Sequence, residues 1–232
     1  MRQFENFGDQ RYQGYCVHCG GDDGTRDHAP SKTLLERPLP ENLPVAPACR
    51  KCNSGFSDDE EYVACLLECV LTGTTDPARI ARPEIARALY KNRKLQRLIE
   101  AGRRETDNGP VWDFDVARVR RVLLKQARGH VAFEINEPHL EEAASVWFGP
   151  LETMTAAQRD QFEGRDEGGL AACPEVGTRA MQRLLVVGDQ VFEEDAWLTV
   201  QPGRYRYRVT QEDGATVRMV LSEFLACQVI WD

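Results

Sequence analysis

Cys16-Val17-His18-Cys19 and Cys49-Arg50-Lys51-Cys52 are two Cys-x-x-Cys pairs with 29 residues between them, and they decide how the first quarter of the chain folds. Each pair is typical of a turn whose backbone N–H groups support two thiolates, and two such turns complete a tetrahedral Cys₄ zinc site. We therefore expect a structural Zn²⁺ on these four cysteines. The alternative is that two unrelated pairs occur by coincidence. We expect His18, between two ligands, to lie at the surface.

The segment enclosed by the pairs carries the residue types that phosphodiester hydrolysis needs. Asp27 offers a carboxylate oxygen, and Asn53, directly after the last cysteine, offers an amide oxygen. Two such ligands, completed by waters and a substrate phosphate, are the usual arrangement for Mg²⁺ or Mn²⁺. His28, beside the metal, is placed to take a proton from the attacking water near neutral pH. The pattern therefore predicts a metal-dependent nuclease.

These residues resemble a known family. The stretches CVHCG over 16–20, RDHAPSK over 26–32 and ENLPVAPACRKCNSGF over 41–56 are similar to the HNH endonucleases, the ββα-metal finger nucleases, in their four-cysteine zinc-bound form. The resemblance implies that His28 is the general base and that Asp27 and Asn53 hold the catalytic metal. It also implies that Asn42 ties down the catalytic loop by hydrogen bonds, which makes this chain an H-N-N variant. DNA is the substrate that the resemblance favours over RNA.

Four basic side chains near the motif are candidates for contact with nucleic acid. Arg26 and Lys32 flank the Asp-His pair, and Arg50 and Lys51 lie between two zinc ligands. Residues in such turns often face a phosphate backbone, but solvated surface is the simpler explanation. The runner-up function is accordingly a zinc-stapled module that binds nucleic acid or protein without catalysis. In that case His28 is dispensable, while the cysteines are not.

Composition limits the location and the partners of the protein. The 232 residues contain no apolar run long enough for a transmembrane helix, and the N-terminus has no apolar signal region. We expect a cytoplasmic protein with reduced thiols and no membrane partner. The formal net charge is −8, but residues 75–130 hold 14 Lys/Arg against 7 Asp/Glu, and a local basic segment can steer a polyanion. The sequence does not define the oligomeric state.

Periodicity predicts an α+β fold, with a zinc-stapled ββα-metal finger, a helical middle and a C-terminal antiparallel hairpin or small sheet. We expect a helix from 57 to about 71, begun by a Ser57/Glu60 capping box and ended by Gly73. Further helical patterns cover 85–90, 95–99 and 114–127, and short helical pieces cover 140–184. Residues 204–210 and 216–221 form a predicted hairpin, with a third strand at 224–231.

The same patterns place the domain boundary near residue 74. Residues 1–74 are the predicted nuclease domain, and 75–232 are an accessory region of unknown role. Cys65 and Cys69 are expected to be core thiols rather than ligands, since a free buried cysteine behaves as a small hydrophobe. Tyr205 and Tyr207 alternate with arginines and suit either base stacking or a half-buried strand, and we favour the strand.

Overall fold

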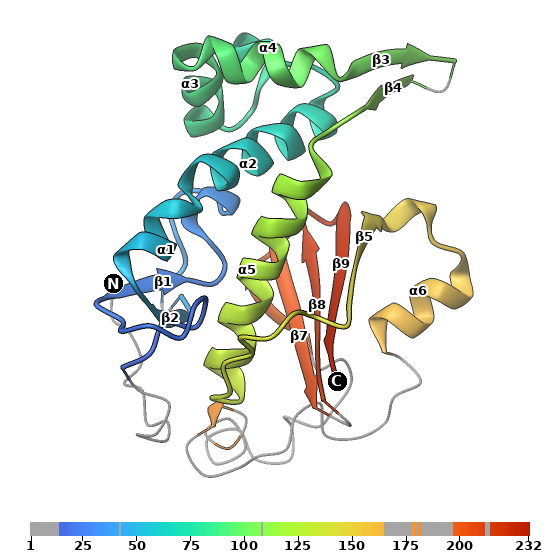
Figure 1. The fold of residues 1–232 in the computed structure, drawn as a ribbon. Helices are drawn as coiled ribbons and strands as arrows, with labels where there is room; N and C mark the ends of the chain where they lie inside the picture. The colour runs from blue at the N-terminus through green and yellow to red at the C-terminus, as the bar shows by residue number, and fades with distance from the viewer. Residues whose placement is uncertain are drawn as a thin grey trace. The chain divides into compact units, whose positions relative to one another are not determined.

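The computed structural model describes residues 14–232, except 42, 108, 165–177, 180, 182–196, 212 and 213. The fold is mixed helix and sheet, with a C-terminal antiparallel sheet, as predicted (Figure 1). The chain divides into two compact units, which are described separately here. The first consists of residues 1–54 and 123–232, and the second consists of residues 55–122. These ranges are not the predicted domains 1–74 and 75–232, and that functional division stays a prediction.

The first unit begins with a small finger. Strand β1 (Thr25–His28) pairs antiparallel with β2 (Val45–Ala48), so that Asp27 lies opposite Ala46 and His28 opposite Val45. A short 3₁₀ turn, η2 (Lys32–Leu34), lies between the strands, and helix α1 (Arg50–Gly55) follows the second strand. The order of elements is therefore strand, strand, helix. The prolines between His28 and Cys49 are compatible with this layout, because proline excludes a long helix there.

The rest of the first unit is a five-stranded antiparallel sheet in the order β5-β9-β8-β7-β6. Its strands are β5 (Ser145–Pro150), β6 (Leu198–Gln201), β7 (Tyr205–Gln211), β8 (Ala215–Leu221) and β9 (Leu225–Trp231). The predicted hairpin and the third strand are confirmed. The predicted helical pieces over 140–184 are wrong at β5, because the segment gains an extended partner in β9 that local periodicity does not reveal. Residues 165–177, 180 and 182–184 of that stretch lie outside the described part.

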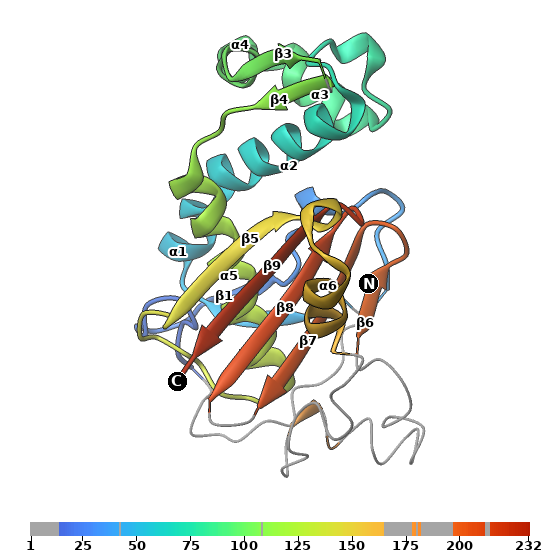
Figure 2. The same cartoon turned by 90° about the vertical axis from the view of Figure 1, so that its right-hand side faces the viewer.

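Helices cover both faces of this sheet (Figure 2). The C-terminal part of helix α5 (Val116–Glu134) packs on the face that carries Tyr205 and Tyr207, through His130 and Glu134. Helix α6 (Ala156–Glu163) follows the 3₁₀ turn η4 (Leu151–Thr153) and covers the opposite face, where Glu163 pairs with Arg206. Along β7 the tyrosines therefore face α5, and Arg206 between them faces α6. This alternation confirms the interpretation as a strand with both faces covered.

The second unit contains the predicted helical middle. Helix α2 (Ser57–Thr72) ends at Gly73 in the left-handed conformation, as expected, and α3 (Pro83–Lys91) and α4 (Arg93–Ala101) follow a 3₁₀ turn, η3 (Pro77–Arg79). A hairpin of β3 (Arg103–Thr106) and β4 (Gly109–Trp112) was not foreseen. The N-terminal part of α5 is joined to α2 by Arg118 and Arg121, which both bind the Asp59 carboxylate.

The predicted capping box at the start of α2 is wrong. Phe56 is the N-cap residue, it already has helical dihedral angles, and it makes no side-chain capping bond. The reason is that α1 ends only one residue earlier, at Gly55, so the chain enters α2 without the extended residue that a capping serine requires. Cys65 and Cys69 are fully buried on this helix, and burial raises the pKa of each thiol to about 12. Their interpretation as core thiols is therefore confirmed.

Candidate metal centre and active site

The four predicted zinc ligands lie together beside the β1–β2 hairpin. The sulfur atoms of Cys16, Cys19, Cys49 and Cys52 all lie within 4.8 Å of one another, and the Sγ atoms of Cys19 and Cys49 are 3.9 Å apart. Tetrahedral zinc with bonds of about 2.3 Å separates its sulfurs by roughly 3.8 Å. The cluster therefore has the ligand type, the ligand number and the spacing that a structural zinc ion needs.

Backbone groups favour the thiolate of Cys49, whereas burial raises the pKa of Cys16 and Cys52. The backbone N–H of Cys52 donates to Sγ of Cys49 at 3.3 Å. This bond is the main cause that lowers the pKa of Cys49 to about 7, and hydrogen bonds with the neighbouring thiols lower it further. The first turn is closed by the backbone N–H of Gly20, which donates to the carbonyl of Cys16 at 2.8 Å. A thiol that ionises near neutral pH is a better metal ligand, because only the thiolate coordinates.

Asn53 is fixed on the hairpin through its amide nitrogen. Nδ2 donates to Oγ1 of Thr25 at 3.1 Å and to the backbone carbonyl of Arg26 at 3.3 Å. A carbonyl only accepts, so the orientation of the amide is determined. The Oδ1 atom has no hydrogen-bond donor among the residues that the structure describes. Asn53 therefore presents the amide oxygen that the predicted role as a ligand for a hard metal requires.

His28 is the last residue of β1, and its side chain is half-buried. Burial lowers the pKa of this imidazole, and the positive charges of Lys32 and Lys125 lower it further, against an opposing effect of Asp27. Within the described ranges no group is hydrogen-bonded to the ring. The imidazole is therefore neutral near pH 7 and free to accept a proton, which are the two properties of a general base.

Asp27 has a different environment, although it adjoins His28. Its side chain is buried, and the alternation of side chains along a strand directs the two neighbours to opposite faces of the hairpin. Oδ2 lies 2.9 Å from Nε2 of His18, and Oδ1 accepts a hydrogen bond of 2.8 Å from Nζ of Lys125. The interpretation of His18 as a surface residue is wrong, since a buried carboxylate selects a polar partner and the first cysteine turn supplies this one.

Lys125 belongs to a buried network that was not expected from the sequence. Besides Asp27, its ammonium donates to Oγ of Ser31 at 2.8 Å, and Ser31 also exchanges two bonds with the side-chain amide of Gln126. Burial raises the pKa of Asp27, but the bond to His18 and the charge of Lys125 outweigh it, so the pKa lies below its usual value. The sequence contains one indication of this network: the polar pair Lys125-Gln126 lies within the apolar pattern of the predicted helix 114–127.

The predicted catalytic metal site is only half compatible with this arrangement. Asn53 presents an oxygen, whereas each carboxylate oxygen of Asp27 already has a partner, one of them a cation. A divalent ion at Asp27 would therefore have to share the carboxylate with Lys125 and His18, or displace one of them. The hydrogen-bond partners of the Asp27 carboxylate are His18 and Lys125. Asn42, the predicted loop anchor, lies outside the described residues.

The four candidate residues for nucleic-acid contact are all at the surface. Arg26 lies on β1, Lys32 begins η2, and Arg50 and Lys51 lie in the first turn of α1; each is exposed. Exposure is compatible both with phosphate contact and with solvated surface. The tyrosines of β7 are excluded from base stacking, because Tyr205 and Tyr207 are buried under α5.

In the part of the chain that the structure describes, no helix combines the length and the apolar character needed to cross a membrane. Comparison of the chain with protein-family models, with curated proteins and with solved structures found no match.

Proposed function

We propose that this protein is an HNH-type endonuclease that hydrolyses phosphodiester bonds in nucleic acid, with DNA as the favoured substrate and the cytoplasm as its location. The observation that carries the proposal is the state of His28. Its half-buried imidazole has a lowered pKa and lies on a hairpin stapled by four clustered cysteines. A closed Cys₄ site performs no chemistry, so zinc would hold the scaffold and His28 would act on the substrate.

The proposed chemistry of His28 is a proton transfer. A neutral imidazole nitrogen accepts the proton of a water molecule as its oxygen attacks phosphorus, and the bond to the leaving oxygen then breaks. Lys32, an exposed cation whose field already acts on His28, is placed to attract the phosphate. A bound phosphate would oppose the effect of Lys32 and raise the pKa of the imidazole, which makes it a stronger base in the complex.

A divalent ion, Mg²⁺ or Mn²⁺, remains part of the proposal, with Asn53 and Asp27 as its ligands. The free Oδ1 of Asn53 supports it, and the pairing of Asp27 with Lys125 opposes it. When bound, such an ion would neutralise the charge that develops on the phosphate. Because each oxygen of Asp27 already has a hydrogen-bond partner, we assign no catalytic step to this carboxylate.

One observation favours a second function, a zinc-stapled binding module without catalysis. Asp27 binds Lys125 and thereby joins β1 to α5. This is a structural role for the carboxylate. If the finger serves only as a scaffold, its exposed basic side chains would still be able to bind a polyanion. These are Arg26, Arg50 and Lys51. This module would need its cysteines and would not need His28.

The experiment that separates the two functions is a cleavage assay with protein of known zinc content. Supercoiled plasmid, single-stranded DNA and RNA are each incubated with Mg²⁺, with Mn²⁺ and without an added divalent ion. Cleavage of any substrate by the wild type supports the nuclease, and the dependence on metal tests whether a divalent ion takes part. Binding without cleavage in all arms, by protein that retains its zinc, would favour the binding module.

A further inference from the structure

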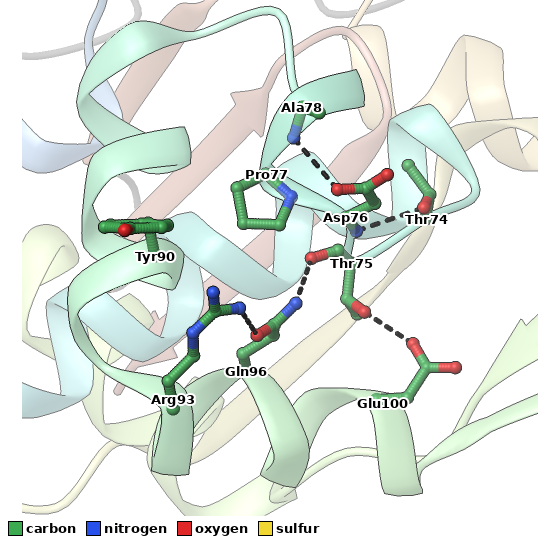
Figure 3. Close-up of a pocket in the computed structure, with 9 residues that line it drawn as sticks. All are labelled: Thr74, Thr75, Asp76, Pro77, Ala78, Tyr90, Arg93, Gln96 and Glu100. Atoms are coloured by element: carbon green, nitrogen blue, oxygen red, sulfur yellow. Dashed lines mark hydrogen bonds between the residues drawn. The ribbon is translucent and has the colours of Figure 1, made fainter.

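The second unit contains a hollow of approximately 530 Å³ at the start of α4, here called the Arg93 hollow (Figure 3). Tyr90, Arg93 and Gln96 line it from α3 and α4, and the loop that follows α2 lines it opposite them. The complete lining is Thr74, Thr75, Asp76, Pro77, Ala78, Tyr90, Arg93, Gln96 and Glu100. None of these residues belongs to the zinc finger, so the proposed nuclease centre does not account for the hollow.

Two neighbours fix the guanidinium of Arg93. It stacks over the ring of Tyr90, 5.0 Å from the centroid, and its Nη1 donates to Oε1 of Gln96 at 2.8 Å. Gln96 is held in turn, because its Nε2 donates to the backbone carbonyl of Thr75 at 2.9 Å. The other N–H groups of Arg93 have no acceptor in the described part of the chain. An arginine that is oriented in this way binds phosphate with little further loss of side-chain entropy.

Arg93 shares the lining of the hollow with two carboxylates, Asp76 and Glu100, but the segment that follows Asp76 is strongly positive. Residues 77–104 hold 9 Lys/Arg against 2 Asp/Glu, and the basic residues of α3 and α4 are exposed. They are Arg87, Lys91, Arg93, Lys94 and Arg97. A local excess of this kind attracts a polyanion even when the whole chain is acidic.

The remaining groups of the hollow suit a nucleobase. Arg93 covers one face of the Tyr90 ring, and the side chain is still 65% exposed, so a base would stack on the other face. Asp76 accepts a hydrogen bond from the backbone N–H of Ala78, and Glu100 accepts one from the hydroxyl of Thr75, so each carboxylate uses one oxygen internally. The second oxygen of a carboxylate accepts hydrogen bonds from the exocyclic amino groups of bases. Donors for phosphate, a ring for stacking and acceptors for amino groups therefore occur together.

We propose that the Arg93 hollow binds one nucleotide of a single-stranded nucleic acid. The phosphate contacts Arg93, the base stacks at Tyr90, and the basic residues of α3 and α4 follow the neighbouring phosphates. The choice of a nucleic-acid strand over another phosphate ligand rests on the proposed nuclease function. A single strand is preferred to a duplex, because only an unpaired base can present its face to a side chain.

The test measures binding in the absence of cleavage. All variants carry His28→Ala in the full-length, zinc-loaded chain, so a failure of the nuclease proposal does not alter the result. Fluorescence anisotropy follows a labelled 12-nucleotide single strand and the duplex of the same sequence over a range of salt concentrations. The variants are Tyr90→Ala, Tyr90→Phe, Arg93→Gln and, as a matched loss of one exposed charge outside the hollow, Arg120→Gln.

The proposal predicts that Tyr90→Ala weakens single-strand binding at least about tenfold, while Tyr90→Phe retains the affinity, since stacking needs only the ring. Arg93→Gln should weaken binding to a similar extent and lower the slope of log Kd against log salt by about 0.7. Arg120→Gln should have a much smaller effect. The proposal is overturned by an absence of single-strand binding, by an unaffected Tyr90→Ala variant, or by equal losses in Arg93→Gln and Arg120→Gln.

Discussion

Nζ of Lys125 lies 2.8 Å from Oδ1 of Asp27, although the two residues are 98 positions apart in the sequence. Both side chains are buried, with 2% and 8% of their surface exposed. The cation that neutralises Asp27 is therefore a side chain of helix α5. This pair anchors the hairpin that carries His28, and it is the contact with which any divalent ion at Asp27 has to compete.

Replacing Lys125 by Met should lower the free energy of unfolding by about 3–5 kcal/mol, because the Asp27 carboxylate then remains buried without its cation. Urea denaturation of zinc-loaded protein measures the loss. The control is the double variant Asp27→Asn/Lys125→Met, which removes both charges and should cost clearly less than the sum of the two single changes. Additive losses would show that the pair has no coupling.

Replacing Cys16 by Ser should abolish the zinc content of the purified chain and unfold the finger, since the metal site and the hairpin form together. Zinc content by mass spectrometry and thermal unfolding report the two effects. Cys65→Ala is the matched control, because this thiol is buried on α2 and lies outside the cluster. It should cost on the order of 1 kcal/mol and leave zinc at its original level. Loss of zinc in the control would reject the assignment of ligands.

Gly129→Ala should destabilise the first unit, although alanine normally favours a helix over glycine. A Cβ atom at Gly129 would lie 2.6 Å from Cβ of Ala29, the buried residue that follows His28. We expect a loss of about 1–3 kcal/mol, measured by urea denaturation. Gly55→Ala is the control, because its Cβ would meet no atom closer than 3.9 Å. The steric argument fails if both variants have the stability of the wild type.

His130 should make the protein less stable as the pH falls. Burial, together with the charge of Lys125, lowers the pKa of its imidazole to about 3 in the folded state, against about 6.5 when unfolded. Between these values the unfolded chain binds the extra proton, so stability decreases from pH 6.5 downwards by at most about 1.4 kcal/mol per pH unit.

Urea unfolding of the wild type and of His130→Phe at pH 7.0, 6.0 and 5.0 isolates this contribution from those of the cysteines and carboxylates. Phenylalanine preserves the stacking on Tyr207, where the ring centroids are 3.7 Å apart, and loses the bond of 2.8 Å to the hydroxyl of Tyr205. The variant should therefore be less stable at pH 7.0, with a shallower dependence on pH. Parallel curves would mean that His130 does not titrate in this range.

Local patterns predicted several of the elements that local interactions determine, although they missed the short hairpin of β3 and β4. The apolar stripe and terminal glycine of α2, and the alternation in β7 and β8, were sufficient for those assignments. The spacing of the cysteines likewise predicted their cluster. Partners that are distant in the sequence escaped prediction, because side-chain periodicity does not specify which element covers a given face. The pairing of β5 with β9 and the burial of His18 against Asp27 belong to this class.

The most direct test of the central claim compares wild type with His28→Ala in single-turnover cleavage of supercoiled plasmid, with Mg²⁺ or Mn²⁺ and with zinc content verified for both proteins. The account predicts that the variant folds, keeps its zinc and its affinity for DNA, and cleaves at least about a hundredfold more slowly, since the loss of a general base costs that much. Cleavage at the wild-type rate by the variant, or no cleavage by folded wild type under any condition, would contradict the account.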